Sequence, residues 1–535
     1  MERIIKVRLA AVAMIAVLCG RLFYISVCKG ESLATRAVIQ RTENIPLRSV
    51  RGIIYDRNML PLTEGQSRLC AAVIPSECAD LEEVERLTGH RIEGGEIRIF
   101  ELNAITEEQA RLVKMRGVRL FNVSERYNAS GILSHVIGYT SDEGGFGIER
   151  VFNDKLTAKQ ADSISMITNA GSGILSGLGF KKTTERTYKG VKLSIDYHIQ
   201  KIVENAMDKG VKSGAAVVVD TKTGDIVAMA SRPNFKQSEL VKYLSSTEGE
   251  LVNRAIMPYD VGSVFKVVLV AAALDEGVYA PHSDFVCNGS IDVSGKEFVC
   301  NDKDGHGRIS LEGGLAHSCN VVFYTIGGRL GIDIISKYAK EFGFGDRVLK
   351  IDALGESAGF IPTDPNSPPA AVANISIGQG TVSVTPLQVA DMLCTIANGG
   401  IRRQLTLVKG MVDDSGASRD VSPADVGRVI SSETAKILKN MLIAAVDYGT
   451  GTAAKIEGWQ TAGKTGSAQT GWLKNGEIMT HGWFGGFFPA DDPQYVCVVL
   501  CENGKSGATS AAPVFREIGE GIKALGIDYS YQRSN

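Results

Sequence analysis

One apolar stretch near the N-terminus, Leu9 to Cys28, most constrains what this chain can fold into. It spans 20 residues with Arg21 as its only charge. An α-helix of that length crosses a hydrocarbon core of about 30 Å. No later stretch of the sequence is both as long and as apolar. We therefore expect one transmembrane helix over residues 9–28, with the folded domains together on one side of the membrane.

Basic residues before the apolar stretch predict its orientation. Arg3, Lys6 and Arg8 precede it, and basic flanks favour the cytoplasmic side. Residues 1–8 are therefore predicted to form a cytoplasmic tail, with everything after Cys28 outside. A cleaved signal peptide is the competing interpretation, but no small-x-small cleavage site follows the run closely. The end of the run loosely resembles a lipoprotein cleavage site, although a bulky valine stands where a small residue is expected.

The composition is that of a globular protein and argues against a nucleic-acid partner. Hydrophobic residues make up 44% and charged residues 22% of the 535 residues, which are ordinary values for folded domains. The formal net charge is −2, so we expect no domain-wide basic surface. A chain of this length is too long for one ordinary domain, and two or three are expected.

The chain changes character near Lys189, where we place a domain boundary. Residues 29–188 are mixed and moderately charged, with no cluster of catalytic residue types. We interpret them as an N-terminal domain with a mechanical role. From residue 191 an alternating apolar pattern predicts a strand, and Asp196 after it is placed to cap a helix. Residues 189–535 then form the second domain.

The second domain begins and ends with strand patterns and has helical patterns between them. Near its start a short turn joins two predicted strands into a hairpin, and near its end two further runs alternate in the same way. The predicted strands cover residues 215–219, 225–230, 483–489 and 495–501, and a final helix is predicted over 513–525. A sheet made from both ends of a domain, with helices inserted in the middle, predicts an α/β layer with an α-helical subdomain.

Three short motifs follow one another in this domain: Ser263-Val264-Phe265-Lys266, Ser318-Cys319-Asn320 and Lys464-Thr465-Gly466. Each is weak alone, because a chain this long contains about two Ser-x-x-Lys strings by chance. Together, a serine with a lysine three residues on, a Ser-x-Asn pair and a Lys-Thr-Gly strand are the parts of an acyl-serine site that works without histidine. Their order therefore predicts a nucleophile.

Ser263 is the predicted nucleophile and Lys266 is its predicted base. Gly262 precedes the serine and an apolar stretch follows to Leu274, which predicts a buried helix that starts at the motif. Positions i and i+3 share one face of a helix, so the lysine amine can reach the serine hydroxyl. Burial favours a neutral amine, which can accept the serine proton. A helix N-terminus also favours the formation of an oxyanion.

Ser318 and Asn320 stand where a loop is predicted to lead into a helix. In acyl transfer, such a hydroxyl can relay a proton toward the leaving amine, and the amide can hold a substrate peptide bond. The alternative is that Ser318 only caps the helix. His317 beside it invites a Ser-His proposal, but a lysine base already fits.

The third motif occurs twice, and it also overlaps a nucleotide-binding pattern. Residues 222–224 lie in the predicted hairpin turn and before Ser263, so we discard that copy. Residues 458–465 match the P-loop pattern, but the residues after them are a poor helix start and ATP is scarce outside the membrane. As a strand edge, residues 464–466 offer an ammonium, a hydroxyl and room for the backbone of an extended peptide that ends in a carboxylate.

With these motifs in this order, the chain resembles a class B penicillin-binding protein, a monofunctional peptidoglycan transpeptidase, of the division or sporulation type. The family pattern is echoed at Arg51–Asn58, Gly147–Glu149, Ile377–Gly380, Thr385–Gln388 and Trp483–Ala490. The resemblance implies a penicillin-binding, β-lactamase-like transpeptidase domain, with an antiparallel sheet flanked by helices and an α-helical subdomain. It also implies an elongated α+β pedestal domain of the dimerisation type at residues 29–188.

The resemblance also implies a role for each matching residue. Ser263 would attack the carbonyl of the penultimate D-alanine of a stem peptide, with Lys266 as the base. D-alanine would leave, and the amine of a neighbouring stem would take the acyl group. Ser318 and Lys464 would complete the proton path. Substrate would be bound by Asn320, Thr465, Gly466 and Ser467. Backbone amides of Ser263 and Ser467 would form the oxyanion hole, and no metal or cofactor is implied.

The partners that the resemblance implies are stem peptides ending in D-Ala-D-Ala, an amine acceptor and the cytoplasmic membrane. β-Lactams resemble the acyl donor and would acylate Ser263 as covalent inhibitors. A polytopic glycosyltransferase and other wall-synthesis proteins are further expected partners. The motifs leave division, elongation and spore-cortex roles equally open.

Other function classes share parts of this pattern. A membrane-bound β-lactam sensor would share the fold, but it needs several membrane helices and a cytoplasmic effector, and only residues 1–8 precede the anchor. A non-catalytic structural member of a wall-synthesis complex would use the N-terminal domain for docking and leave Ser263 dispensable. A secreted β-lactamase fits less well with the anchor and the long N-terminal domain.

Ten cysteines are unusual for an enzyme outside the cytoplasm, and Cys319 lies inside the second motif. Cys287 and Cys300 flank a predicted hairpin, and an oxidising compartment allows them to form a bridge. Our sharper hypothesis is that Cys319 pairs with Cys300 or Cys287, distorts Ser318 and Asn320, and makes activity redox-sensitive. The alternative is three buried thiols.

A Zn²⁺ site among Cys287, Cys300, Asp304 and His306 is the remaining interpretation of this region. Their spacing matches no compact zinc motif. The sequence therefore predicts no metal site.

Overall fold

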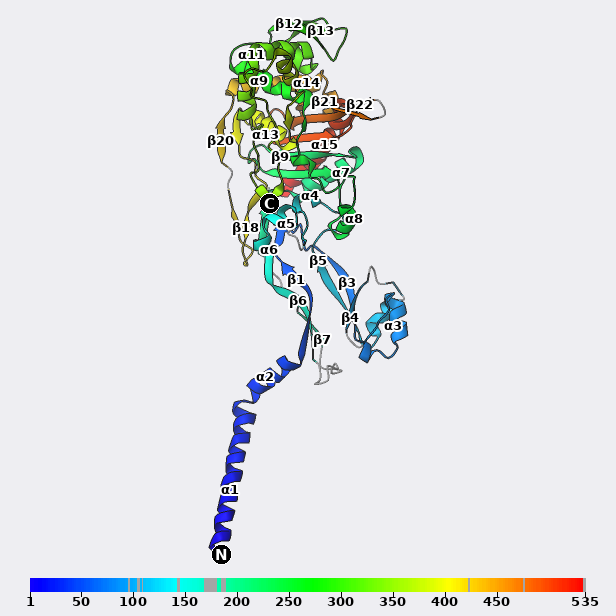
Figure 1. The fold of residues 1–535 in the computed structure, drawn as a ribbon, viewed down its shortest axis with the longest axis vertical. Helices are drawn as coiled ribbons and strands as arrows, with labels where there is room; N and C mark the ends of the chain where they lie inside the picture. Colours follow the sequence, from blue (N-terminus) through cyan, green and yellow to red (C-terminus); the bar gives the residue numbers. More distant parts are fainter. Residues whose placement is uncertain are drawn as a thin grey trace. The chain divides into compact units, whose positions relative to one another are not determined.

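The structure is a computed structural model that describes residues 1–94, 97–102, 106–107, 109–141, 145–167, 180–183, 189–421, 424–474 and 477–532. The chain divides into two compact units, and Figure 1 draws it in colours that follow the sequence. Unit 1 contains residues 1–52, 66–125 and 157–187, and unit 2 contains residues 53–65, 126–156 and 188–535. This division is discontinuous, whereas the sequence predicted a single boundary near Lys189.

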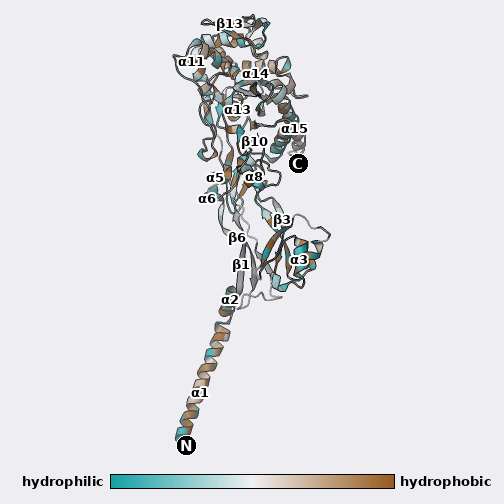
Figure 2. Ribbon diagram, turned by 45° about the vertical axis from the view of Figure 1, so that its right-hand side comes forward, coloured by the Kyte–Doolittle hydropathy of each residue, from teal (hydrophilic) through white to brown (hydrophobic). Residues whose placement is uncertain are grey.

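Unit 1 begins with the helix that the sequence predicted to cross a membrane. α1 (Glu2–Phe23) continues through a π-helical turn, η1 (Tyr24–Cys28). In the described part of the chain, Glu2–Cys28 is the one helix long and apolar enough to span a membrane, with a mean hydropathy of 2.1. Figure 2 shows α1 mostly in the brown of apolar residues. The predicted span, residues 9–28, lies within this helix.

Two small antiparallel sheets make up much of the rest of unit 1. β1 (Thr42–Arg51) follows α2 (Gly30–Arg41) and pairs with β6 (Thr157–Ile167), which pairs with β7 (Phe180–Thr183). In the second sheet β3 (Gln66–Val73) lies between β4 (Arg98–Leu102) and β5 (Val118–Glu125). Val73 of this sheet and Val84 of α3 (Leu81–Thr88) share one apolar core. The predicted α+β character is therefore confirmed for this unit.

Unit 2 is built on a five-stranded antiparallel sheet that comes from both ends of its sequence. The strand order is β10–β9–β23–β22–β21. The strands are β9 (Gly214–Asp220), β10 (Ile226–Arg232), β21 (Ala462–Lys474), β22 (Glu477–Phe488) and β23 (Tyr495–Cys501). The four strands predicted from the sequence are confirmed. β21, which carries the third motif, forms one edge.

The two faces of this sheet pack against different helices. Val217 and Val219 belong to one apolar core, shared with α13 (Pro386–Ala397). Val218 points the other way because side chains alternate along a strand, and it packs in a second core with α7 (Tyr197–Gly210) and α15 (Ala512–Gln532). Figure 1 shows α7 and α15 together beside the sheet. The sheet is therefore a middle layer that is buried on both faces.

Helices inserted between β10 and β21 form the predicted helical subdomain. In α9 (Lys266–Asp275) every residue from Lys266 to Ala273 is buried. This follows from its continuous apolar sequence. The subdomain also includes α10 (Leu311–Ala316), α11 (Asn320–Glu341), α12 (Pro369–Ser376) and α14 (Ser432–Asp447). Two small strand pairs, β12 (Asp284–Cys287) with β15 (Gly307–Ser310) and β13 (Ser290–Val293) with β14 (Lys296–Val299), lie between α9 and α10 in the sequence.

Long-range pairing explains why residues 53–65 belong to unit 2. β2 (Ile53–Tyr55) pairs in parallel with β8 (Gly190–Leu193), the strand predicted from residue 191 onward. The next residue, Asp56, is buried, and its carboxylate accepts the backbone N–H groups of Asn58 at 2.7 Å, Leu60 at 2.8 Å and Tyr197 at 3.2 Å. One carboxylate thus joins a tight turn to the start of α7.

A buried ion pair lies within residues 126–156, the second separate segment of unit 2. Glu149 on α5 (Gly147–Val151) accepts a hydrogen bond from Arg126 Nε at 2.7 Å. Both residues lie within residues 126–156, and the glutamate is buried. A charged pair removed from water needs such close geometry to be tolerated. The family-like segment Gly147–Glu149 is therefore linked to the start of residues 126–156 by this ion pair.

We predict that Asp56→Ala destabilises the protein strongly. Three backbone donors would lose a charged acceptor, and one hydrogen bond to a charged group contributes about 1.5–3 kcal/mol, so we expect a loss of about 3 kcal/mol in the free energy of unfolding. Chemical denaturation of the detergent-solubilised chain measures it. Asp413→Ala is the matched control, because Asp413 also accepts backbone N–H groups in a turn but is exposed. Equal small losses for both variants would contradict the assignment.

Candidate active site

Ser263 lies in a short 3₁₀ turn, η6 (Gly262–Phe265), that leads directly into α9. Gly262 before it has φ +57°, and a Cβ there would come within 2.9 Å of the Ser467 carbonyl oxygen on β21. Its N–H donates to the Gly378 carbonyl oxygen at 2.9 Å. The glycine therefore allows the serine turn to approach the edge strand closely, which no residue with a side chain would permit.

The Lys266 side chain is completely buried and points at the second motif. Its Nζ donates to Asn320 Oδ1 at 2.7 Å, to the Ser318 carbonyl oxygen at 2.8 Å and to Ser318 Oγ at 3.2 Å. Burial lowers the pKa of Lys266 to about 7, because an apolar surrounding disfavours the charged form. Among the described residues its hydrogen-bond partners belong to the second motif rather than to Ser263.

Ser318 occupies the loop between α10 and α11 in a left-handed conformation, with φ +58°. Such a conformation is uncommon for a residue with a side chain. Cys319, rather than Ser318, stands at the N-cap of α11, and no side-chain capping hydrogen bond is present. The alternative that Ser318 serves only as a helix cap is therefore wrong. Its hydroxyl lies beside the Lys266 amine instead.

The third motif lies in β21, where Lys464 pairs with Gly485 and Gly466 with Trp483 of β22. A strand at these positions rules out a P-loop, which requires a helix after the lysine. The Lys464 side chain is buried, and its Nζ donates to the Thr465 carbonyl oxygen at 3.0 Å. Burial, together with the neighbouring charge of Lys266, holds the pKa of Lys464 well below its usual range.

Gly466 serves close packing between the edge strand and the serine turn. A Cβ at this position would lie 2.9 Å from the Val261 carbonyl oxygen and 3.0 Å from Val264 Cγ2. The sequence suggested that this glycine leaves room for substrate backbone. On the side where a Cβ would point, that space is filled by the residues that flank Ser263.

A cavity of about 750 Å³ brings the three motifs together. Six of the predicted site residues line it: Ser263, Cys300, Ser318, Asn320, Thr465 and Ser467. Lys266 and Lys464 are buried and are not among its lining residues. The cavity therefore exposes the hydroxyl and amide groups, while the two lysines stand behind them.

The cavity also includes residues that the sequence did not single out as site residues. Thr450 lies with its Oγ1 2.5 Å from Thr465 Oγ1 and extends the hydroxyl row of the third motif. Residues 296–299 and Asn301, from the β13–β14 hairpin and the loop after it, form another part of the lining, and Lys505 lies in a third part. Ile377 and Gln379 do carry a sequence signal, because both stand in the family-like segment Ile377–Gly380.

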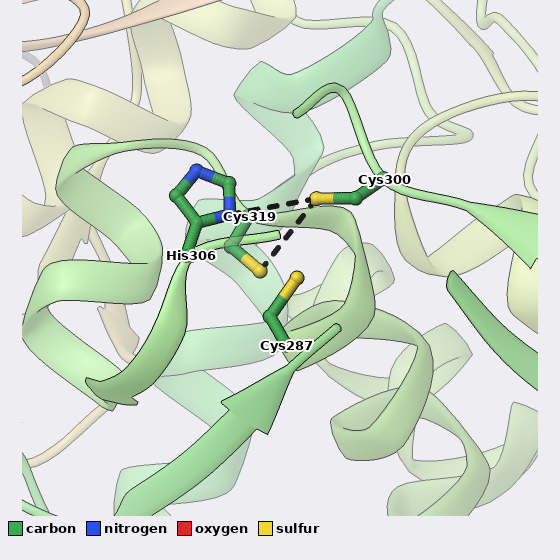
Figure 3. A group of neighbouring side chains, drawn as sticks. All are labelled: Cys287, Cys300, His306 and Cys319. Atoms are coloured by element: carbon green, nitrogen blue, oxygen red, sulfur yellow. Dashed lines mark hydrogen bonds between the residues drawn. The ribbon is translucent and has the colours of Figure 1, made fainter. Parts of the chain in front are cut away.

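The three cysteines of the redox hypothesis lie close together next to the second motif (Figure 3). The Sγ atoms of Cys300 and Cys319 are 3.8 Å apart, and Cys287 belongs to the same group. All three are buried free thiols. The proposed pairing of Cys319 stays a prediction.

Comparisons with known proteins match the domain that carries the three motifs. Residues 214–520 match the family model of the penicillin binding protein transpeptidase domain. Stage V sporulation protein D of Bacillus subtilis is 30% identical over 566 residues, an alignment that covers 98% of this chain and 86% of that protein. Peptidoglycan D,D-transpeptidase MrdA of Escherichia coli is 26% identical, with 95% and 92% of the two chains covered.

Two solved structures have similar folds. The D,D-transpeptidase domain of a peptidoglycan glycosyltransferase from Eggerthella lenta has a TM-score of 0.66 and 25% identity, covering 90% of this chain and 100% of that chain. A chain from a study of polymerization and crosslinking by a peptidoglycan synthase complex has a TM-score of 0.72 and 25% identity, with 97% and 98% covered. The fold class predicted from the sequence is confirmed.

Proposed function

The chain belongs to the penicillin-binding protein transpeptidase family, and we propose that Ser263 is the nucleophile of its acyl transfer. The protein is a serine-type peptidoglycan D,D-transpeptidase, which cross-links stem peptides through an acyl-serine with release of D-alanine. One observation carries the assignment of residues. The buried Lys266 amine has its pKa lowered to about 7 and is hydrogen-bonded by the second motif. It lies beside the cavity that Ser263 lines.

In the acylation step, Ser263 Oγ attacks the carbonyl carbon of the penultimate D-alanine, and its proton passes to the neutral Lys266 amine. The backbone N–H groups of Ser263 and Ser467 stabilise the resulting oxyanion, because oriented donors act strongly in a site shielded from water. Collapse of the intermediate breaks the peptide bond, and the proton travels to the leaving amine. Ser318 Oγ, 3.2 Å from Lys266 Nζ, is the first relay on that path.

In the deacylation step, the amine of a second stem peptide attacks the ester carbonyl. Its proton passes to the Lys266 amine and returns to Ser263 Oγ as the ester bond breaks. The second lysine, Lys464, supports this cycle electrostatically. Two buried ammonium groups that lie near each other repel, and this repulsion lowers the pKa of Lys464. At least one of the two amines therefore stays neutral.

The edge position of β21 suits an extended donor peptide. Among the described strands, β21 pairs with β22 alone, and a peptide can add to the other side of an edge strand. Thr465 and Thr450 offer hydroxyl groups for the terminal carboxylate, and Asn320 offers its amide for a peptide bond. β-Lactams that mimic this donor would acylate the same serine.

The protein is a membrane protein of the wall-synthesis machinery. We infer further that its N-terminus lies in the cytoplasm and its catalytic domain outside, because Arg3, Lys6 and Arg8 precede α1. A polytopic glycosyltransferase is the partner we infer, since cross-linking requires glycan strands to be polymerised nearby. The structural neighbour from a peptidoglycan synthase complex supports this inference.

We predict that Ser263→Ala abolishes covalent labelling by a fluorescent penicillin. Lys266→Ala should keep the serine but slow acylation about 10²- to 10⁴-fold, because that is the range of a general base. Mass spectrometry of the penicillin adduct locates the acylated residue. Ser415→Ala, in an exposed turn, is the control and should label normally. Labelling of the Ser263→Ala variant would show that another residue is the nucleophile, and its complementation of a deletion would support a scaffold role instead.

We predict that the acylation rate rises with pH up to about 7 and is level above it. Lys266 accepts a proton only when neutral, and its pKa is lowered to about 7, so the protonated and inactive form dominates below that pH. The rate should change about tenfold per pH unit on the acidic side. Stopped-flow acylation between pH 5.5 and 8.5 measures it. Lys266→Arg keeps its charge throughout and should be slow at every pH, whereas a flat wild-type profile would exclude Lys266 as the base.

A further inference from the structure

Four potential metal ligands from separate elements converge next to the second motif (Figure 3). They are Cys287 at the end of β12, Cys300 directly after β14, His306 directly before β15, and Cys319 at the N-cap of α11. Their ligand atoms all lie within 4.8 Å of one another. The three thiols are buried and the imidazole is half-buried. We propose that these four residues bind one Zn²⁺ ion.

The distances within the group have the dimensions of a tetrahedral zinc site. With Zn–S bonds near 2.3 Å and Zn–N bonds near 2.0–2.1 Å, a tetrahedron has S···S edges of about 3.8 Å and S···N edges of about 3.6 Å. The Sγ atoms of Cys300 and Cys319 are 3.8 Å apart, and Cys300 Sγ is 3.6 Å from His306 Nδ1. Two edges of the coordination polyhedron are therefore already formed.

The chemistry of the donors selects the metal. Three thiolates and one imidazole form a closed four-coordinate set of the kind that holds structural zinc, with no position left for water or substrate. Harder cations such as Mg²⁺ and Ca²⁺ require oxygen ligands instead. On binding, the three thiols give up their protons and the imidazole binds in its neutral form. The ion is therefore expected to organise the protein rather than to take part in acyl transfer.

A disulfide accounts for fewer of these residues. A bridge between Cys300 and Cys319 would use two of the four groups and leave Cys287 and His306 without a role. The backbone is also shaped to bring the loops together, since a Cβ on Gly305 would lie 2.3 Å from the Cys287 carbonyl oxygen. The backbone N–H of Cys300 donates to the Gly289 carbonyl oxygen at 2.7 Å, which fixes the Cys300 backbone close to the strand that ends at Cys287. Convergence of all four donors is what a metal requires.

The metal would act on catalysis through the second motif. Cys319 lies between Ser318 and Asn320, the two residues that hold the Lys266 amine. Cys300 follows the hairpin that lines the cavity, and Tyr324 on α11 donates to the Val299 carbonyl oxygen at 3.3 Å. Zn²⁺ would therefore hold three parts together: the start of α11, the β13–β14 hairpin and the loop that carries Ser318. In this role Cys319 is a positioning residue, and this part of the inference rests on the proposed function.

The first test is the metal content of the full chain, purified in detergent without chelator. Mass spectrometry of the elements should find about one zinc per chain, as one closed four-ligand site requires. Cys287→Ala and His306→Asn should each lose most of it. Cys394→Ala is the matched control, because Cys394 is an equally buried thiol outside the group, and it should retain the ion. Zinc retained by both ligand variants would overturn the assignment.

X-ray absorption at the zinc edge of the wild-type protein keeps the test decisive if a ligand variant fails to fold. The expected spectrum has three sulfur neighbours and one nitrogen neighbour. Wild-type protein that carries no zinc, and binds none after equilibration with Zn²⁺ while its thiols remain titratable, would overturn the proposal. A Cys300–Cys319 disulfide in zinc-free wild-type protein would also overturn it and would favour the redox switch.

A third measurement separates this proposal from the proposed function. Ser263→Ala should keep its zinc, so the metal content reports on the site even if another residue were the nucleophile. Removal of zinc by a chelator should slow penicillin acylation of the wild type by about 10- to 100-fold, because a small displacement of catalytic groups has effects of that size. Added Zn²⁺ should restore the rate, and an acylation rate unchanged by full zinc removal would contradict the link to the second motif.

Discussion

The burial of one amine organises the catalytic centre. Lys266 is placed in the protein interior with its Nζ hydrogen-bonded to Ser318 and Asn320, and a second buried lysine stands nearby. Removing an ammonium from water is so unfavourable that the group tends to give up its proton. The apolar packing of the helical subdomain around α9 therefore has a catalytic effect, because it lowers the pKa of Lys266 and so favours the neutral amine that can accept a proton. The hydroxyl groups face the cavity, while the basic nitrogens remain behind them.

Local patterns predicted the elements that depend on nearest neighbours. The strands of the central sheet, the Asp196 cap of α7 and the helix that follows the Ser263 turn all follow from short-range alternation and capping. The three motifs predicted four of the residues that line the cavity, Ser263, Ser318, Asn320 and Thr465. The second Lys-Thr-Gly copy, at residues 222–224, lies in a turn as expected.

The features that the sequence did not predict depend on contacts over long separations. Parallel pairing of β2 with β8 joins residues more than a hundred positions apart, and no local pattern records such a partner. The left-handed backbone of Ser318 carries no signal in a Ser-Cys-Asn string. The zinc interpretation of the sequence named Asp304 with Cys287, Cys300 and His306, whereas the group in the structure contains Cys319 in place of Asp304. Its members come from four separate elements, and compact spacing rules apply only when ligands share a turn.

The strand order of the central sheet has a consequence for how the protein is made. β23 lies between β9 and β22, so its partner β9, made almost 300 residues earlier, stays an unpaired edge until residues 495–501 have been synthesised. Pairing between distant segments is slow to form, and unpaired strands are prone to aggregation. Through most of its synthesis, this domain therefore exposes an unpaired strand edge. The nucleophile assembles with its edge strand only after nearly the whole polypeptide is present.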